Sequence, residues 1–153
     1  MKLIGKGGLS RAVEILLLVL LFVAPVIMAT LPWTIPLISQ KYPGGEGHFY
    51  EKYMVILALS GILAECILWQ ARGLMGNVNQ GKAFSADTVR RLKVIGIECL
   101  TLGGMYAVAL LFVTKIFTVA VLVTFVVVGM ILLVFSELFR QAVAYKEEND
   151  MTI

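Results

Sequence analysis

Four long apolar stretches, separated by polar segments, set the pattern of the chain. Each has about 20 residues, the length at which a helix rising 1.5 Å per residue crosses the ~30 Å hydrocarbon core of a bilayer. The pattern therefore predicts an all-α protein, a membrane-embedded four-helix bundle formed by one domain over residues 1–153. The predicted spans are about 13–37, 53–69, 94–113 and 116–138.

The first predicted span contains Pro25, Pro32 and Pro36. Each proline removes a backbone donor, so the second half of this helix is expected to be kinked or unwound. A basic start ahead of an apolar run is also typical of a signal peptide. The run continues through Ile38 without a clear cleavage site, which favours a retained span.

Polar segments connect the predicted spans. Pro43 and several glycines in 39–52 argue against a regular element there. The connection at 114–115 is so short that the third and fourth spans must be antiparallel neighbours. A central loop over 70–93 and a tail over 139–153 complete the chain.

The end of the central loop has the pattern of a helix start. Gly81 breaks the chain, Ser85 is placed to cap a helix, and Asp87 falls in the first turn, where a negative charge suits the helix dipole. Basic residues follow, and from Val94 the sequence is almost wholly apolar. We therefore expect a helix that begins in water, passes a basic collar and enters the membrane.

Composition agrees with a membrane protein, because 59% of residues are hydrophobic and 15% are charged, against about 25% charged in soluble domains. The net charge of +3 reflects orientation in the membrane. Ten lysine and arginine residues lie in the N-terminal segment, the central loop and the tail, against three on the other side. The positive-inside rule then places both termini and the central loop in the cytoplasm. We expect no direct nucleic-acid binding.

Small residues predict where helices approach one another. Gly103 and Ala107 lie four apart in the third span, with Gly96 and Gly104 near the same face. Lipid gives no advantage to small residues, whereas close backbone contact does. Gly103 and Ala107 are therefore expected to face another helix.

Every predicted span carries one carboxylate near its cytoplasmic end. An ionisable group at the centre of a span costs on the order of 3 kcal/mol, so it normally faces the protein interior or finds a partner. Arg11 and Arg140 lie within one turn of the first and last of these carboxylates, whereas the middle two are deeper. Interfacial ion pairs and a shared inner-leaflet polar cluster both remain open. The four carboxylates are Glu14, Glu65, Glu98 and Glu137, and the candidate cluster comprises Glu65, Glu98, Glu137, Arg91 and Arg140.

Signs of catalysis are missing from the sequence. Cys66 and Cys99 lie in apolar runs and His48 is the only histidine, so no set of metal ligands is visible. No nucleophile–base pair or phosphate-binding loop is visible either. We therefore expect a non-enzymatic protein without a cofactor or metal.

Short motifs give the chain a family resemblance. Four spans combine with Gly81, Phe84, the Arg91–Leu92 pair, Gly96 and the C-terminal segment 148–153. This set resembles the domain-of-unknown-function 2975 family of small bacterial membrane proteins. Ala83 stands where the family pattern favours proline, and Thr88 where it favours asparagine. The resemblance implies an inner-membrane protein that partners a small cytoplasmic helix-turn-helix regulator.

Two classes of function follow. The first is a regulatory partner of such a DNA-binding regulator, and the second is a small transport or immunity protein that binds a peptide, lipid or ion between its helices. Anionic lipid headgroups would also attract the basic loop, and a homo-oligomer is compatible with either class. The predicted cytoplasmic interaction surface comprises Lys82, Phe84, Arg90, Arg91, Lys93, Asp150, Thr152 and Ile153.

Overall fold

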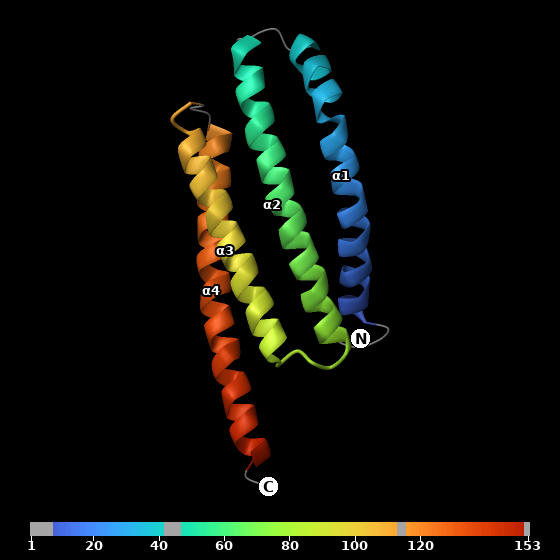
Figure 1. Cartoon of the computed structure of the whole chain (residues 1–153), viewed down its shortest axis with the longest axis vertical. Helices are drawn as coiled ribbons and strands as arrows, with labels where there is room; N and C mark the ends of the chain where they lie inside the picture. Colours follow the sequence, from blue (N-terminus) through green and yellow to red (C-terminus); the bar gives the residue numbers. More distant parts are fainter. Residues whose placement is uncertain (1–7, 42–46, 113–115, 152–153) are drawn as a thin grey trace.

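The computed structural model describes residues 8–41, 47–112 and 116–151, and this part of the chain contains four α-helices and no strand. All four helices are long and apolar enough to cross a membrane. The predicted all-α, four-span architecture is therefore confirmed. The helices are α1 (Leu9–Lys41), α2 (Gly47–Asn79), α3 (Ala86–Ala109) and α4 (Ile116–Met151) (Figure 1).

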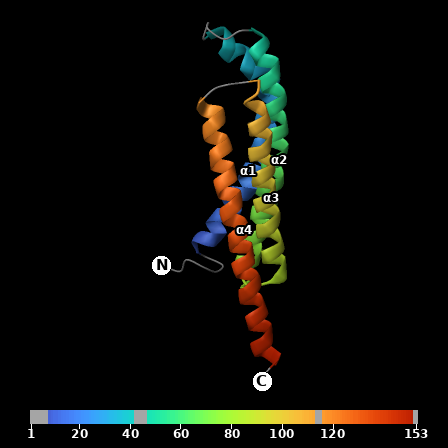
Figure 2. The ribbon, with the colours of Figure 1, turned by 90° about the vertical axis from the view of Figure 1, so that its left-hand side faces the viewer.

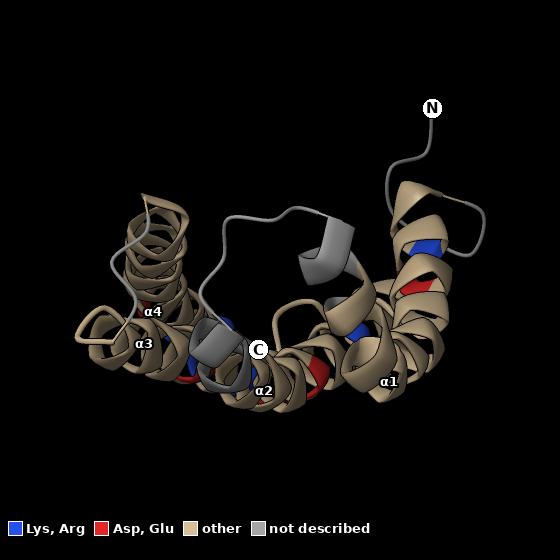
Figure 3. Cartoon of the chain, turned by 90° about the horizontal axis from the view of Figure 1, so that it is seen from above, with Lys and Arg blue, Asp and Glu red and all other residues tan. Residues whose placement is uncertain are grey.

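The helices pack in chain order. Contacts between described residues join α1 to α2, α2 to α3 and α3 to α4, and no contact joins α1 to α4. Seen from above, the bundle is an open, curved row (Figure 3). The most apolar stretches of α1 and α2 contain no buried residue, whereas α3 is the most buried helix. In a bilayer, much of α1 and α2 therefore contacts lipid.

The α3–α4 contact forms the core, as the antiparallel arrangement of these helices predicted. Leu102 is 1% exposed. Gly96 and Gly129 bring the two backbones together, because a Cβ added to Gly96 would lie 3.2 Å from the Gly129 carbonyl oxygen, and one added to Gly129 3.0 Å from the Gly96 carbonyl oxygen. A Cβ on Gly103 would lie 2.7 Å from Val126 Cγ2.

The predicted small-residue face is therefore correct for Gly103 and wrong for Ala107, which is exposed. Gly104 likewise has open space beside its Cα. The buried positions of α3 recur every three or four residues, as on one stripe of a helix, and positions 104 and 107 fall outside that stripe.

Helix α1 passes through Pro25, Pro32 and Pro36 without interruption. Figure 1 shows it curving along its length, and Figure 2 shows its upper end leaning away from α2. Prolines are the usual cause of such bends. The first span is thus bent, as expected, and does not unwind.

Helix occupies most of the predicted central loop. Helix α2 continues to Asn79 and α3 begins at Ala86, so only the residues between them are irregular. Gly81 has a φ of +74°, its N–H donates to Val78 O (3.1 Å), and the Lys82 N–H donates to Asn77 O (2.9 Å). This is a Schellman C-cap, which needs a residue tolerant of positive φ. A helix stops at such a signal rather than where the apolar sequence ends.

The start of α3 agrees with its prediction, because Ser85 Oγ accepts a hydrogen bond from the Thr88 N–H at 3.3 Å. The other polar segments are more helical than expected. Helix α1 reaches Lys41, α2 starts at Gly47, and α4 runs to Met151 in the predicted tail. As in the central loop, polarity alone did not end these helices.

Candidate functional site

One end of the molecule gathers most of its charged side chains. Helix α1 begins there, α2 ends, α3 begins and α4 ends, so the first and last helices meet this end as predicted (Figure 1). We call it the basic end. Its described lysines and arginines are Arg11, Arg72, Lys82, Arg90, Arg91, Lys93, Arg140 and Lys146.

Asn79 joins α2 to the start of α1. Ser10 Oγ donates to Asn79 Oδ1 at 2.6 Å, and Asn79 Nδ2 donates to Glu14 Oε2, also at 2.6 Å. Among the described side chains, Arg11 forms no ion pair with Glu14. The interfacial partner of Glu14 is therefore an amide on the next helix rather than the arginine on its own helix.

Arg91 joins α3 to α2. Its Nε donates to Asp87 Oδ2 at 2.7 Å, and its Nη1 donates to Gln70 Oε1 at 3.0 Å. The guanidinium occupies the space beside Gly73, where a Cβ would clash with it. Asn77 Nδ2 also donates to Asp87 Oδ2, at 2.7 Å. Asp87 and Gln70 therefore hold Arg91 by hydrogen bonds, and Gly73, which has no side chain, leaves room for its guanidinium.

Two adjoining cavities lie along α2. The interfacial cavity, of about 230 Å³, is lined by Trp69, Gln70, Asp87, Arg90, Arg91 and Val94. The carboxylate cavity, of about 410 Å³, is lined by Leu21, Glu65, Cys66, Trp69, Gln70 and Glu98. Because Trp69 and Gln70 line both, the two cavities are neighbours along α2.

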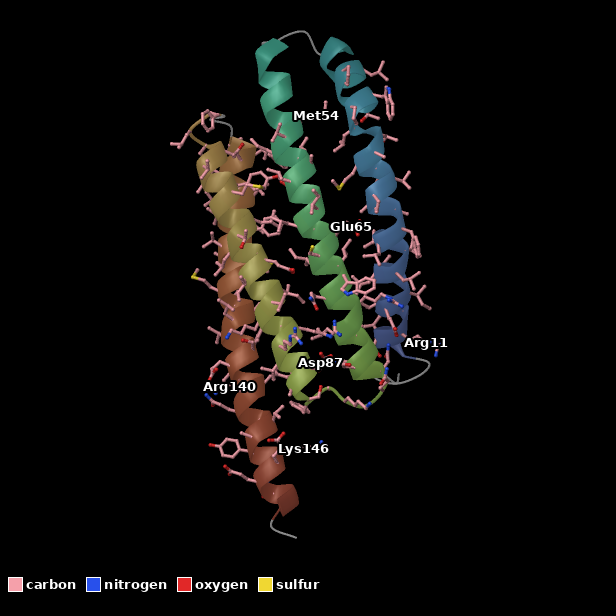
Figure 4. The ribbon with its side chains drawn as sticks, viewed as in Figure 1. Arg11, Met54, Glu65, Asp87, Arg140 and Lys146 are labelled. Carbon is pink, nitrogen blue, oxygen red and sulfur yellow. The ribbon has the colours of Figure 1, made fainter. Side chains whose placement is uncertain are left out.

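Glu65 and Glu98 come from different helices and line the same cavity. Glu65 Oε1 and Glu98 Oε2 are buried without a hydrogen-bond partner, as is Nε of Arg72 within the part of the chain that the structure describes. Figure 4 shows the Glu65 side chain between α2 and α1. Counted along α2 and α3, these two carboxylates lie farther from the basic end than Gln70, Asp87 and Arg91.

Glu137 and Arg140 lie apart from this cavity. They pair with each other on α4, with 2.5 Å between Arg140 Nη2 and Glu137 Oε1, and both side chains are at least half exposed. The structure thus divides the five-residue candidate cluster. Glu65 and Glu98 share one cavity, Arg91 lines the next, and the Glu137–Arg140 ion pair faces outward.

The predicted interaction surface is also divided. Lys82, Arg90 and Lys93 are exposed, whereas Arg91 is turned toward α2. The Phe84 ring stacks on Phe139 of α4, with 5.3 Å between ring centroids. Asp150 belongs to α4, and its side chain lies outside the described part, as do Thr152 and Ile153 entirely.

Helix α4 continues well past the ends of α2 and α3 at the basic end (Figures 1 and 2). We call residues 139–151 the α4 extension. Its described side chains are exposed or half-buried. A groove between the extension and the start of α3 is lined by Ala86, Val89, Arg140, Val143, Ala144 and Glu147.

Sequence reasoning missed Gln70, Gly73 and Asn77, because it placed them in a loop. Their spacing of i, i+3 and i+7 contained a usable signal, since these positions share one face of a helix. The structure places all three on the side of α2 that meets Asp87 and Arg91 of α3.

Four apolar helices with a polar network at one end define a multi-pass α-helical membrane protein. The family described as "Protein of unknown function (DUF2975)" matches residues 12–153, and the chain belongs to it. The resemblance seen in the sequence is thereby confirmed. No curated protein and no solved structure matches the chain.

Proposed function

We propose that this protein is a non-enzymatic bacterial inner-membrane protein that holds a small cytoplasmic helix-turn-helix regulator through its α4 extension. The length of α4 carries the proposal. Its 36 residues amount to about 54 Å of helix, of which ~30 Å suffices to cross the hydrocarbon core. Roughly 16 residues of α4 are then left outside the core, and the α4 extension accounts for most of them.

The charge distribution supports a cytoplasmic location for the basic end. Eight lysines and arginines of the described residues lie at this end. Basic residues near span ends are retained in the cytoplasm. The α4 extension leaves the membrane at the same end, so it is available to a cytoplasmic partner.

The surface of the extension suits a helical partner. Tyr145 is 68% exposed on the extension, and the groove between the extension and α3 combines apolar Val143 and Val89 with the charged side chains of Arg140 and Glu147. Grooves of this mixed character accept amphipathic helices. The Phe84–Phe139 stack fixes the base of the extension to the α2–α3 turn, so the extension projects in a defined direction.

Site-specific crosslinking tests this proposal with a co-expressed small helix-turn-helix regulator as the probe. We expect p-benzoylphenylalanine in place of Tyr145 to crosslink the co-expressed regulator in membranes. The same residue in place of Arg11, exposed at the same end but on α1, is the matched control. Val143→Arg should lower the Tyr145 crosslink by about tenfold, corresponding to the loss of one good contact.

Deletion of Glu148 to Ile153 should likewise weaken crosslinking without changing membrane insertion, measured by carbonate extraction. Equal crosslinking from the two positions, or none from Tyr145, would contradict a docking role for α4. The transport or immunity hypothesis would then be the better one.

A further inference from the structure

Glu65 and Glu98 have no cationic partner among the residues that the structure describes. Both residues belong to helices long and apolar enough to span the membrane. The ion pairs among the described residues are Arg91–Asp87 and Arg140–Glu137, and neither includes these carboxylates. Each also retains a buried oxygen without a hydrogen-bond partner. Because carboxylates in a span are costly, such residues normally mark a functional position.

The cavity between these carboxylates has the size and chemistry of a ligand site. Its volume of about 410 Å³ falls within the range of small-molecule sites, roughly 300–1,000 Å³. The lining comprises two acids, an amide, a thiol, an indole and a leucine, with no basic side chain. Trp69 is 57% exposed, so its ring is open to a ligand.

This combination selects the class of ligand. Two carboxylates attract positive charge, and an indole ring attracts cations over its face. Leu21 and Trp69 favour apolar substituents, which a small metal ion lacks. Cys66 and Trp69 are exposed on α2, on a part of the helix row that lipid covers in a bilayer. A ligand that carries both a positive charge and apolar groups would enter the cavity from the membrane.

We propose that the carboxylate cavity binds an amphiphilic organic cation, with its charge toward Glu65 and Glu98 and its apolar groups against Trp69 and Leu21. Arg90 and Arg91 line the adjoining interfacial cavity, where Asp87 pairs with Arg91. The interfacial cavity is therefore lined by basic and acidic side chains, whereas the charged groups that line the carboxylate cavity are both acidic. This site does not depend on the proposed regulatory partner.

Equilibrium dialysis of the purified full-length protein in neutral detergent tests the site, with tetraphenylphosphonium as the probe. Tetraphenylborate has nearly the same shape and the opposite charge, so it reports apolar partitioning alone. We expect saturable binding of the phosphonium and none of the borate. Trp33→Phe leaves Trp69 as the only tryptophan, and saturable quenching of its fluorescence should follow the dialysis isotherm.

Glu65→Gln and Glu98→Gln should each weaken phosphonium binding by about tenfold, and the double variant should abolish it. Glu137→Gln, which removes a carboxylate on the outside of α4, should leave binding unchanged. Circular dichroism shows whether each variant is folded. If the double variant is not folded, the two single variants alone test the site.

Equal binding of both ions, unchanged binding in the glutamine variants, or no saturable binding by the parent would overturn the site. The regulator is absent from this assay and the α4 extension is not altered. Failure of the cation site and failure of regulator docking are therefore separate results.

Discussion

Gly96→Leu is expected to lower the unfolding temperature in detergent more than any other single change considered for this protein. The α3 backbone at Gly96 lies against the α4 backbone at Gly129, and a Cβ added there would lie 3.2 Å from the Gly129 carbonyl oxygen and 3.0 Å from the Leu133 side chain. Backbone cannot move aside as a flexible side chain can. Overpacking of this kind costs about 3 kcal/mol of unfolding free energy.

Gly104→Leu is the matched control, because it places the same side chain on the same helix where nothing lies within 4 Å. Thermal unfolding followed by circular dichroism should show a large decrease for Gly96→Leu and little change for Gly104→Leu. Gly103→Leu should fall between them, because its nearest neighbour is a side-chain atom of Val126. Equal melting temperatures for the first two variants would show that α3 and α4 do not pack through Gly96.

Arg91→Met should weaken the contact between α2 and α3 at the basic end. The change keeps much of the side-chain length and removes the hydrogen bonds to Asp87 and Gln70. Hydrogen bonds to charged groups contribute roughly 1.5–3 kcal/mol in mutational series. Because the Arg91 side chain is 27% exposed, we expect a loss of about 2 kcal/mol in the free energy of unfolding.

Arg90→Met is the control for Arg91→Met, since Arg90 is the adjacent residue, has the same charge and is exposed. Exposed substitutions of this type usually change stability by no more than about 0.5 kcal/mol. Unfolding in mixed detergent and sodium dodecyl sulfate measures both variants under the same conditions. Comparable losses would mean that net charge at the basic end, rather than the Arg91 geometry, stabilises the α2–α3 contact.

Hydropathy was sufficient to predict the fold class, because a bilayer leaves only helices as spanning elements for a chain of this pattern. It was not sufficient for the contacts between helices. The spacing of small residues selected Gly103 correctly and Ala107 wrongly, since the line along which α4 crosses α3 decides which small residue is covered. Gly129 was missed altogether, although a glycine among valines was a visible signal.

The sequence predicted those residues of the candidate site whose side chains are costly to place in a membrane. Glu65 and Glu98 were recognisable as costly carboxylates, and the structure places them at one cavity. Their neighbour Gln70 was not recognised, because helix continuation past the apolar stretch depends on a stop signal that first appears at Gly81. Glu137 was grouped with them because the sequence gives its depth in the membrane and not the direction in which α4 faces.

The side of the membrane on which the α4 extension lies is measured most directly with one accessible cysteine. Tyr145→Cys in a Cys66→Ala, Cys99→Ala background leaves the extension with the only thiol of the chain. A membrane-impermeant maleimide should label it in inverted inner-membrane vesicles and not in intact spheroplasts. Labelling in spheroplasts would place the extension outside the cell, and labelling in neither preparation would place it within the bilayer; either result would contradict a cytoplasmic docking helix.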